Sequence, residues 1–106
     1  MKLKFPKKIR IDEQVFEIRW DKKGFDAEFA FADEKHAFIR IGIADIKKSP
    51  LSVLMRIIHE LKEIVHIQQA TRYRRTDNQE YEFHYTHKEH TDMCARLAGL
   101  LDEFIK

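Results

Sequence analysis

Three residues near the middle of the chain, His59, Glu60 and Glu63, have side chains and a spacing suited to metal chemistry. On a helix, positions i and i+4 lie on one face with Cβ atoms roughly 5–6 Å apart, so His59 and Glu63 can bind the same ion. Glu60 lies about 100° further round, where a carboxylate can act as a general base for an attacking water molecule. The spacing indicates a metal site with hydrolytic chemistry.

A simpler interpretation of His59 and Glu63 stays open. Both residues fall on the polar side of the predicted helix, where an i,i+4 pair is commonly a solvated surface pair. Such a pair contributes a few tenths of a kcal/mol and binds nothing.

His90 is the third ligand that the sequence predicts. It lies on the apolar stripe of a second amphipathic segment, one turn before Met93 and Cys94, so we expect its imidazole to face the protein. Burying an imidazole costs free energy unless its nitrogens are bonded, either to one carboxylate or to a metal shared with His59 and Glu63. Three protein ligands and a water molecule would make a catalytic site with one zinc, or another divalent transition metal, per chain.

Other residues could supply or replace a ligand. His66 follows Glu63 by three positions, a spacing found in di-iron bundles, although such a bundle needs four helices. His87 and Glu89 lie near the start of the second helical segment and compete for the third position. His84 and His87, with Tyr81, Phe83 and Tyr85 interleaved, could line a cleft at the metal site, supply an alternative ligand or form a polar loop.

Two helices are expected to position these side chains. Ser49 and Pro50 supply an N-cap and a first-turn proline, which predicts a helix from about residue 50 to the low 70s. Its predicted core side comprises Val53, Leu54, Ile57, Ile58, Leu61, Ile64 and Val65. Its predicted polar side comprises Met55, Arg56, His59, Lys62, Glu63 and His66. The segment from Thr86 to Glu89 has the form of a capping box and starts a second helix that runs nearly to Lys106.

The first half of the chain predicts an antiparallel sheet of about four strands in two hairpins. Residues 7–20 alternate apolar and polar side chains around a polar break at 12–14. Residues 25–32 and 36–43 are rich in aromatic and β-branched residues and flank a turn at 33–35. The expected fold is α+β, with this sheet followed by two packed helices. At 106 residues the chain is long enough for one hydrophobic core, so residues 1–106 are expected to form one domain.

Composition limits the classes of function. Cys94 is the only cysteine, which excludes an internal disulfide and a cysteine-based zinc site and suggests a reducing compartment such as the cytoplasm. The chain has neither an apolar run of signal-peptide length nor the roughly 20 apolar residues of a membrane span, so we expect a soluble protein without a membrane partner. A net charge of +2 argues against nucleic acid, although the basic run at 72–75 could contact phosphates.

The sheet, the His59-Glu60-Leu61-Lys62-Glu63 segment and the later helix led by His90 resemble the minimal zincin-like proteins of phages and prophages. In that family an H-E-x-x-H or H-E-x-x-E helix packs on a curled sheet, and a later histidine or acid completes the metal site. The resemblance covers the chain from about Phe25 onward. It implies a metallopeptidase-like fold with His59, Glu63 and His90 as ligands and Glu60 as base.

The resemblance implies metallopeptidase-like chemistry, and the expected partner is a peptide or protein of unknown identity. A carboxylate at position 63, where H-E-x-x-H has histidine, adds negative charge and should weaken the metal as a Lewis acid; the hydrolase chemistry could therefore be degenerate. The alternative function is a non-enzymatic module whose polar helix face contacts a partner protein. The sequence fixes neither the substrate nor the oligomeric state.

Overall fold

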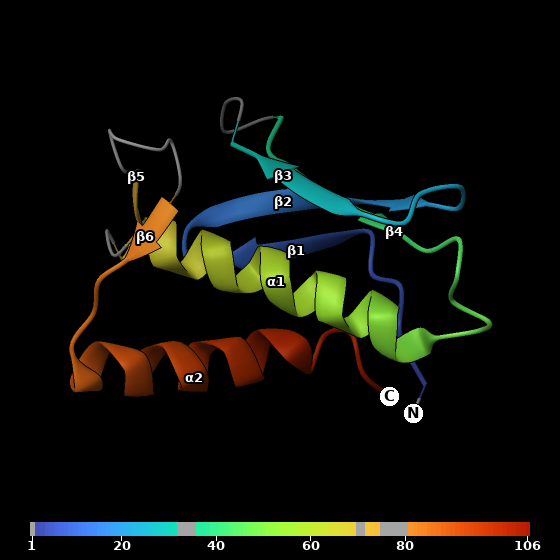
Figure 1. The fold of residues 1–106 in the computed structure, drawn as a ribbon. Helices are drawn as coiled ribbons and strands as arrows, with labels where there is room; N and C mark the ends of the chain where they lie inside the picture. Colours follow the sequence, from blue (N-terminus) through green and yellow to red (C-terminus); the bar gives the residue numbers. More distant parts are fainter. Residues whose placement is uncertain (1, 32–35, 70–71, 75–80) are drawn as a thin grey trace.

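In a computed structural model, the chain forms an α+β fold in which a four-stranded mixed sheet is followed by two helices (Figure 1). The structure describes residues 2–31, 36–69, 72–74 and 81–106. Helix α1 lies between the sheet and helix α2, so the described elements stack as sheet, helix and helix (Figure 1). Neither helix in the described part of the chain has the length and apolar character needed to cross a membrane.

The sheet contains β1 (Lys8–Ile11), β2 (Gln14–Asp21), β3 (Ala27–Ala30) and β4 (Phe38–Gly42) in the order β1-β2-β4-β3. The two antiparallel pairs predicted from the sequence are confirmed, because β1 pairs with β2 and β3 pairs with β4. The turn predicted at residues 33–35 lies outside the described residues. The prediction of a wholly antiparallel sheet is wrong, because β4 pairs with β2 in parallel.

The mixed sheet arises because β4 is inserted between β2 and β3. Backbone hydrogen bonds from Gly42 N to Asp26 O (2.7 Å) and from Ile43 N to Asp21 O (2.8 Å) tie the end of β4 to the loop before β3 and to the last residue of β2. The β4 sequence FIRIG suits this central place, since Ile39 and Ile41 are buried and a strand paired on both edges leaves no open row of backbone N–H and C=O groups.

Helix α1 (Pro50–Gln68) begins where the N-cap was predicted, with the Ser49 Oγ accepting a hydrogen bond from Ser52 N at 3.2 Å. It ends at Gln68, a few residues before the predicted low 70s. Its apolar side packs on the sheet and forms the core with β-strand residues. The core members that are at most 2% exposed are Ile11, Phe16, Ile39, Ile41, Val53, Ile57, Leu61, Ile64, Val65 and Phe104.

Helix α2 (His87–Leu101) confirms the predicted capping box. Glu89 N donates to Thr86 Oγ1 at 3.2 Å, and Thr86 N donates to Glu89 Oε1 at 3.0 Å. The helix packs alongside α1 (Figure 1), and Met93 is buried at the contact side. Near the C-terminal end of α1, Arg96 donates a hydrogen bond to Gln68 Oε1 at 2.7 Å.

A second, two-stranded sheet of β5 (Arg72–Arg74) and β6 (Tyr81–Phe83) follows α1. Sequence analysis missed both strands, because each has three residues, too few to establish an alternating pattern. Arg75 and the side chains of residues 72–74, which carried the nucleic-acid hypothesis, lie outside the described part of the structure.

The close approach of the loop before β3 to the end of β4 gives a test of this topology. A Cβ at Gly42 would lie 2.5 Å from Gly24 C and 2.7 Å from Asp26 O, whereas a Cβ at Gly99 in α2 meets nothing within 4 Å. We expect Gly42→Ala to lower the free energy of unfolding by about 1–3 kcal/mol through overpacking.

The matched control is Gly99→Ala, which should raise the free energy of unfolding by about 0.5–1 kcal/mol because alanine favours a helix interior. Urea denaturation followed by circular dichroism measures both variants. Equal stability of the two variants would show that the loop does not cover the end of β4.

Candidate metal centre

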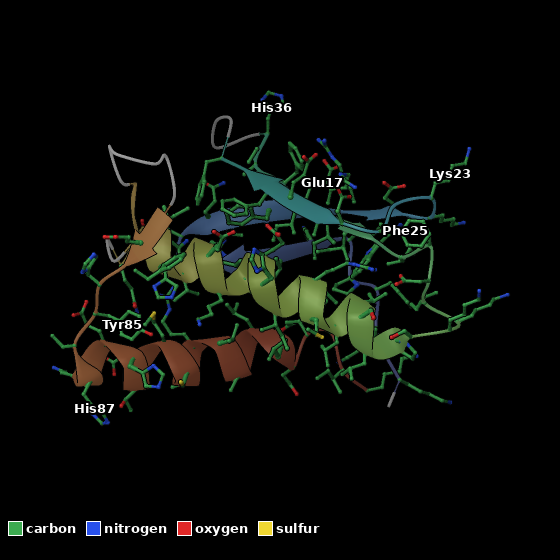
Figure 2. All side chains as sticks on the ribbon, viewed as in Figure 1. Glu17, Lys23, Phe25, His36, Tyr85 and His87 are labelled. Atoms are coloured by element: carbon green, nitrogen blue, oxygen red, sulfur yellow. The ribbon has the colours of Figure 1, made fainter. Side chains whose placement is uncertain are left out.

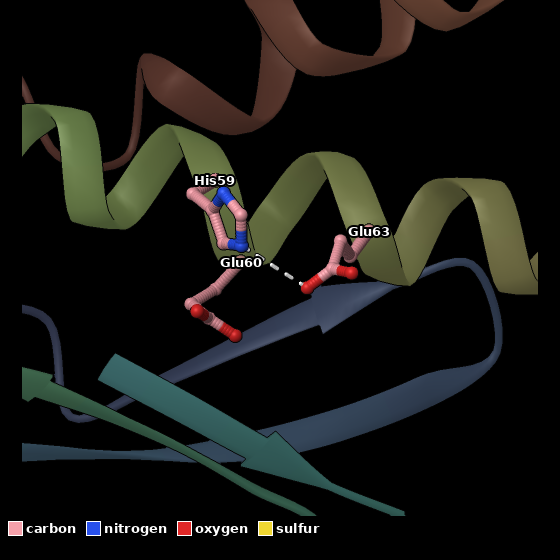
Figure 3. Close-up of side chains that lie close together, drawn as sticks. All are labelled: His59, Glu60 and Glu63. Carbon is pink, nitrogen blue, oxygen red and sulfur yellow. Dashed lines mark ion pairs between the residues drawn. The ribbon is translucent and has the colours of Figure 1, made fainter. Parts of the chain in front are cut away.

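Helix α1 brings three potential ligand groups together. One ligand atom from each of His59, Glu60 and Glu63 lies within 4.8 Å of the other two. The Nε2 atom of His59 and the Oε2 atom of Glu63 are 3.3 Å apart (Figure 3). Among the described residues this is the one such group that could hold a metal ion.

Helical geometry explains how these side chains differ in exposure. Going round α1 from the buried Ile57, Glu60 lies about 60° away, Glu63 about 120° and His59 about 160°, on the opposite side. Exposure rises in the same order, from 1% for Ile57 and 4% for Glu60 to 20% and 67% for the side chains of Glu63 and His59. The group therefore begins at the core and opens to solvent, and Glu60 points toward the sheet (Figure 3).

The donor set fits a divalent transition metal. Zinc binds imidazole nitrogen and carboxylate oxygen at about 2.0–2.2 Å in tetrahedral geometry, which places neighbouring ligand atoms about 3.4 Å apart. The His59 to Glu63 separation of 3.3 Å already meets this requirement. One imidazole and two carboxylates suit zinc, iron or manganese. The same 3.3 Å also defines an ordinary i,i+4 ion pair, so the distance agrees with both interpretations.

A pocket of about 440 Å³ lies beside the group, between α1 and the edge strand β3. His59 and Glu60 line it together with Ala27, Met55 and Arg56. Sequence analysis did not identify Ala27 as a site residue, because its place depends on β3 lying at the sheet edge nearest this part of α1, a tertiary feature without a local pattern.

His90 is not brought to this group. The sequence predicted that the His90 side chain faces the protein, and this prediction is wrong, because the side chain is exposed. Its ring stacks on Tyr85 with centroids 5.7 Å apart, and its Nε2 is 3.7 Å from Cys94 Sγ. The physical reason is the alignment of the two helices, because Arg96, further along α2 than His90, already lies beside the end of α1. Because α1 ends at Gln68, close to Arg96 of α2, the first turn of α2 extends past it (Figure 1).

The two alternatives for the third position also lie outside the group. Glu89 is used in the capping box of α2, where its carboxylate accepts a hydrogen bond from Thr86 N. His87 is exposed and points away from α1 (Figure 2). His84, in the preceding segment, pairs with Glu82 at 3.0 Å. The third protein donor nearest His59 and Glu63 is therefore Glu60, which the sequence assigned as a base.

His66 is buried, although the sequence placed it on the polar side of α1. It is 2% exposed, and its ring lies 4.4 Å from Phe83 and 5.4 Å from Tyr85, centroid to centroid. These aromatic residues come from β6 and the segment after it, which covers the end of the helix face. The expectation that residues 81–87 could line the cleft is confirmed for Phe83 and Tyr85. With His59, Lys62, Glu63 and His66 they line a second pocket, of about 230 Å³.

Comparisons of the chain with protein-family models, with curated proteins and with solved structures found no significant match. The resemblance to zincin-like proteins therefore stays a prediction.

The environment of His66 makes stability depend on pH. Burial, and then the nearby Lys62 charge, lower the pKa of His66 below its usual 6.5, while Glu63 acts in the opposite direction. The unfolded chain therefore takes up a proton at higher pH than the folded protein. Stability from neutral His66 is complete above pH 6.5 and is lost as the pH falls toward the folded pKa.

Urea denaturation of metal-free protein between pH 8 and pH 5 measures this effect. We expect the free energy of unfolding to fall over this range, and to fall less in His66→Phe, which keeps an aromatic ring against Phe83 without a titrating group. Identical pH profiles for the two proteins would contradict the assigned environment of His66.

Proposed function

We propose that the protein binds one divalent transition metal ion, zinc in the first instance, and catalyses metal-dependent hydrolysis of a peptide or protein. The observation that carries the proposal is the convergence of His59, Glu60 and Glu63, whose ligand atoms lie within 4.8 Å of one another at a pocket mouth. A zincin-like relationship to phage or prophage proteins, and a cytoplasmic location consistent with the free Cys94, are parts of this proposal.

His59 and Glu63 are assigned as metal ligands, because their atoms are already separated by the distance that two tetrahedral ligands require. When bound, the metal would polarise a substrate carbonyl and make water more acidic. Glu60, the third donor of the group, is assigned as the proton acceptor rather than as a ligand, so His59 and Glu63 are the two protein ligands of this proposal. The Glu60 carboxylate lies in the wall of the pocket, between the exposed imidazole of His59 and the sheet, where a substrate entering the pocket would meet it.

The edge strand β3 supports a peptide as substrate. Ala27 begins this strand and lines the same pocket as His59 and Glu60. In the part of the chain that the structure describes, β3 pairs with β4 alone, and the open edge of a strand can pair with an extended peptide. Such a peptide would run past the ligand group with its backbone carbonyls near the metal position.

Metal content tests the site itself. Protein purified without an affinity tag or chelator should contain about one zinc or similar ion per chain, as measured by elemental mass spectrometry. We expect His59→Ala to lose this ion and to bind added Zn²⁺ about 100-fold more weakly or worse, because one ligand is removed.

His90→Ala is the matched control, since it removes an exposed histidine from outside the group. It should keep the metal content of the native chain. Loss of metal in both variants would instead support the sequence-based assignment of His90 as third ligand. Retention of metal by His59→Ala would refute the site.

Turnover tests the role of Glu60. Glu60→Gln preserves the size of the buried side chain but cannot accept a proton, so hydrolysis of quenched-fluorescent peptide libraries should fall by about 100- to 10,000-fold. The metal content should be unchanged. Loss of the ion together with turnover would make Glu60 a ligand, and unchanged turnover would exclude it as the base.

A further inference from the structure

Two adjoining pockets at another part of the surface combine apolar side chains with lysines. The larger, of about 600 Å³, is lined by apolar Phe25, Ile43 and Ile46 and by three lysines. The smaller, of about 250 Å³, is lined by Leu3, Phe5, Ile46 and Pro50 and by two lysines. Because Ile46 lines both, the pockets are neighbours. Figure 2 shows Phe25 and Lys23 at this end of the molecule.

Fixed backbone contacts build the larger pocket. Gly42 N donates to Asp26 O at 2.7 Å and Ala44 N donates to Gly24 O at 3.0 Å, which join the loop carrying Phe25 to the segment after β4. Arg56 of α1 then fixes that segment by donating to both carboxylate oxygens of Asp45, at 2.6 and 2.8 Å. The pocket walls therefore come from segments tied to the sheet and to α1.

The charge around the two pockets is positive. Their lysines are Lys2, Lys22, Lys47, Lys48 and Lys106. The carboxylate side chain in the lining is that of Asp45, and its two hydrogen bonds from Arg56 hold its pKa below the usual range, so this charge is already balanced. Nearby, Asp21 and Asp26 are paired with Arg40 at 3.0 and 2.9 Å. In the described part of the chain, no carboxylate pairs with the lysines of the pockets.

Large apolar side chains are exposed around the same pockets. Phe25 is 66% exposed and Phe5 46%. Leu51, which follows Pro50 in the first turn of α1, is 61% exposed. Exposed apolar area with a charged rim is typical of an interaction surface.

We propose that these two pockets bind an acidic segment of a partner protein, with one apolar side chain of the partner in each pocket and its carboxylates against the lysines. Protruding side chains can fill pockets of about 250 and 600 Å³, whereas the flat surface of a bilayer cannot. The shape of the surface therefore favours a peptide over a lipid bilayer as the ligand. The lysines supply charge complementarity. The surface shares no lining residue with the two pockets beside His59.

Fluorescence anisotropy tests the proposal with a defined probe, a short fluorescein-labelled peptide in which Phe and Leu are separated by Glu and Asp. We expect the native chain to bind this probe, and to bind it about tenfold more weakly when Lys47 and Lys48 are both changed to Glu. Phe25→Ser should weaken binding by a similar factor through loss of apolar contact. Replacing both Phe and Leu of the probe by Ser should abolish binding.

The matched control is the double change Lys7→Glu and Lys8→Glu, which reverses two adjacent exposed lysines at the start of β1 and alters the net charge equally. This control should bind the probe as the native chain does. Equal weakening in both double variants, or no binding by the native chain, would overturn the proposal. If the native chain binds phosphatidylserine vesicles more tightly than the peptide, and the same variants lose this binding, the ligand of the pockets is an anionic lipid surface and the peptide proposal is wrong. His59→Ala should not affect any of these measurements, which separates them from the metal site.

Discussion

The packing of α1 on the mixed sheet is the constraint on which the rest of the structure depends. Val53, Ile57, Leu61 and Ile64 are each at most 1% exposed, so this contact fixes how the helix is rotated about its axis. Once the rotation is fixed, the angle of an α1 side chain to that apolar side largely sets its exposure; His66 is an exception, because Phe83 and Tyr85 cover it. The outward direction of His59 and the contact of Arg56 with Asp45 both follow from this one orientation.

Features that depend on neighbouring residues could be predicted from the sequence. Both helix starts were identified, because Ser49 and Thr86 cap the backbone within three residues of themselves. The proximity of His59 and Glu63 was predicted for the same reason, since an i,i+4 pair requires only that the helix forms. Strand pairing is different. The insertion of β4 between β2 and β3 depends on backbone contacts between distant segments, and alternation within a strand does not encode its partner.

The placements of His90 and His66 show why the remainder of the site could not be predicted. The apolar stripe of α2 predicts a buried His90 only if α1 continues beside it, and α1 ends too early. Conversely, a helical wheel puts His66 on the polar side, but Phe83 and Tyr85 from after α1 cover it. In both cases the sequence identified the side of the helix on which the histidine lies. Whether another segment covers that side depends on the tertiary structure.

Arg56 connects the two candidate sites. It lines the pocket beside His59 and Glu60, while its partner Asp45 lines the larger lysine-rich pocket. The Arg56 guanidinium donates hydrogen bonds to both Asp45 carboxylate oxygens and to the carbonyl of Gly42. The positive charge of Arg56 is therefore balanced by Asp45, in the loop between β4 and α1. These hydrogen bonds hold the loop that carries Lys47 and Lys48 against α1. A single ion pair therefore lies between the pocket beside His59 and the lysine-rich surface formed by segments outside α1.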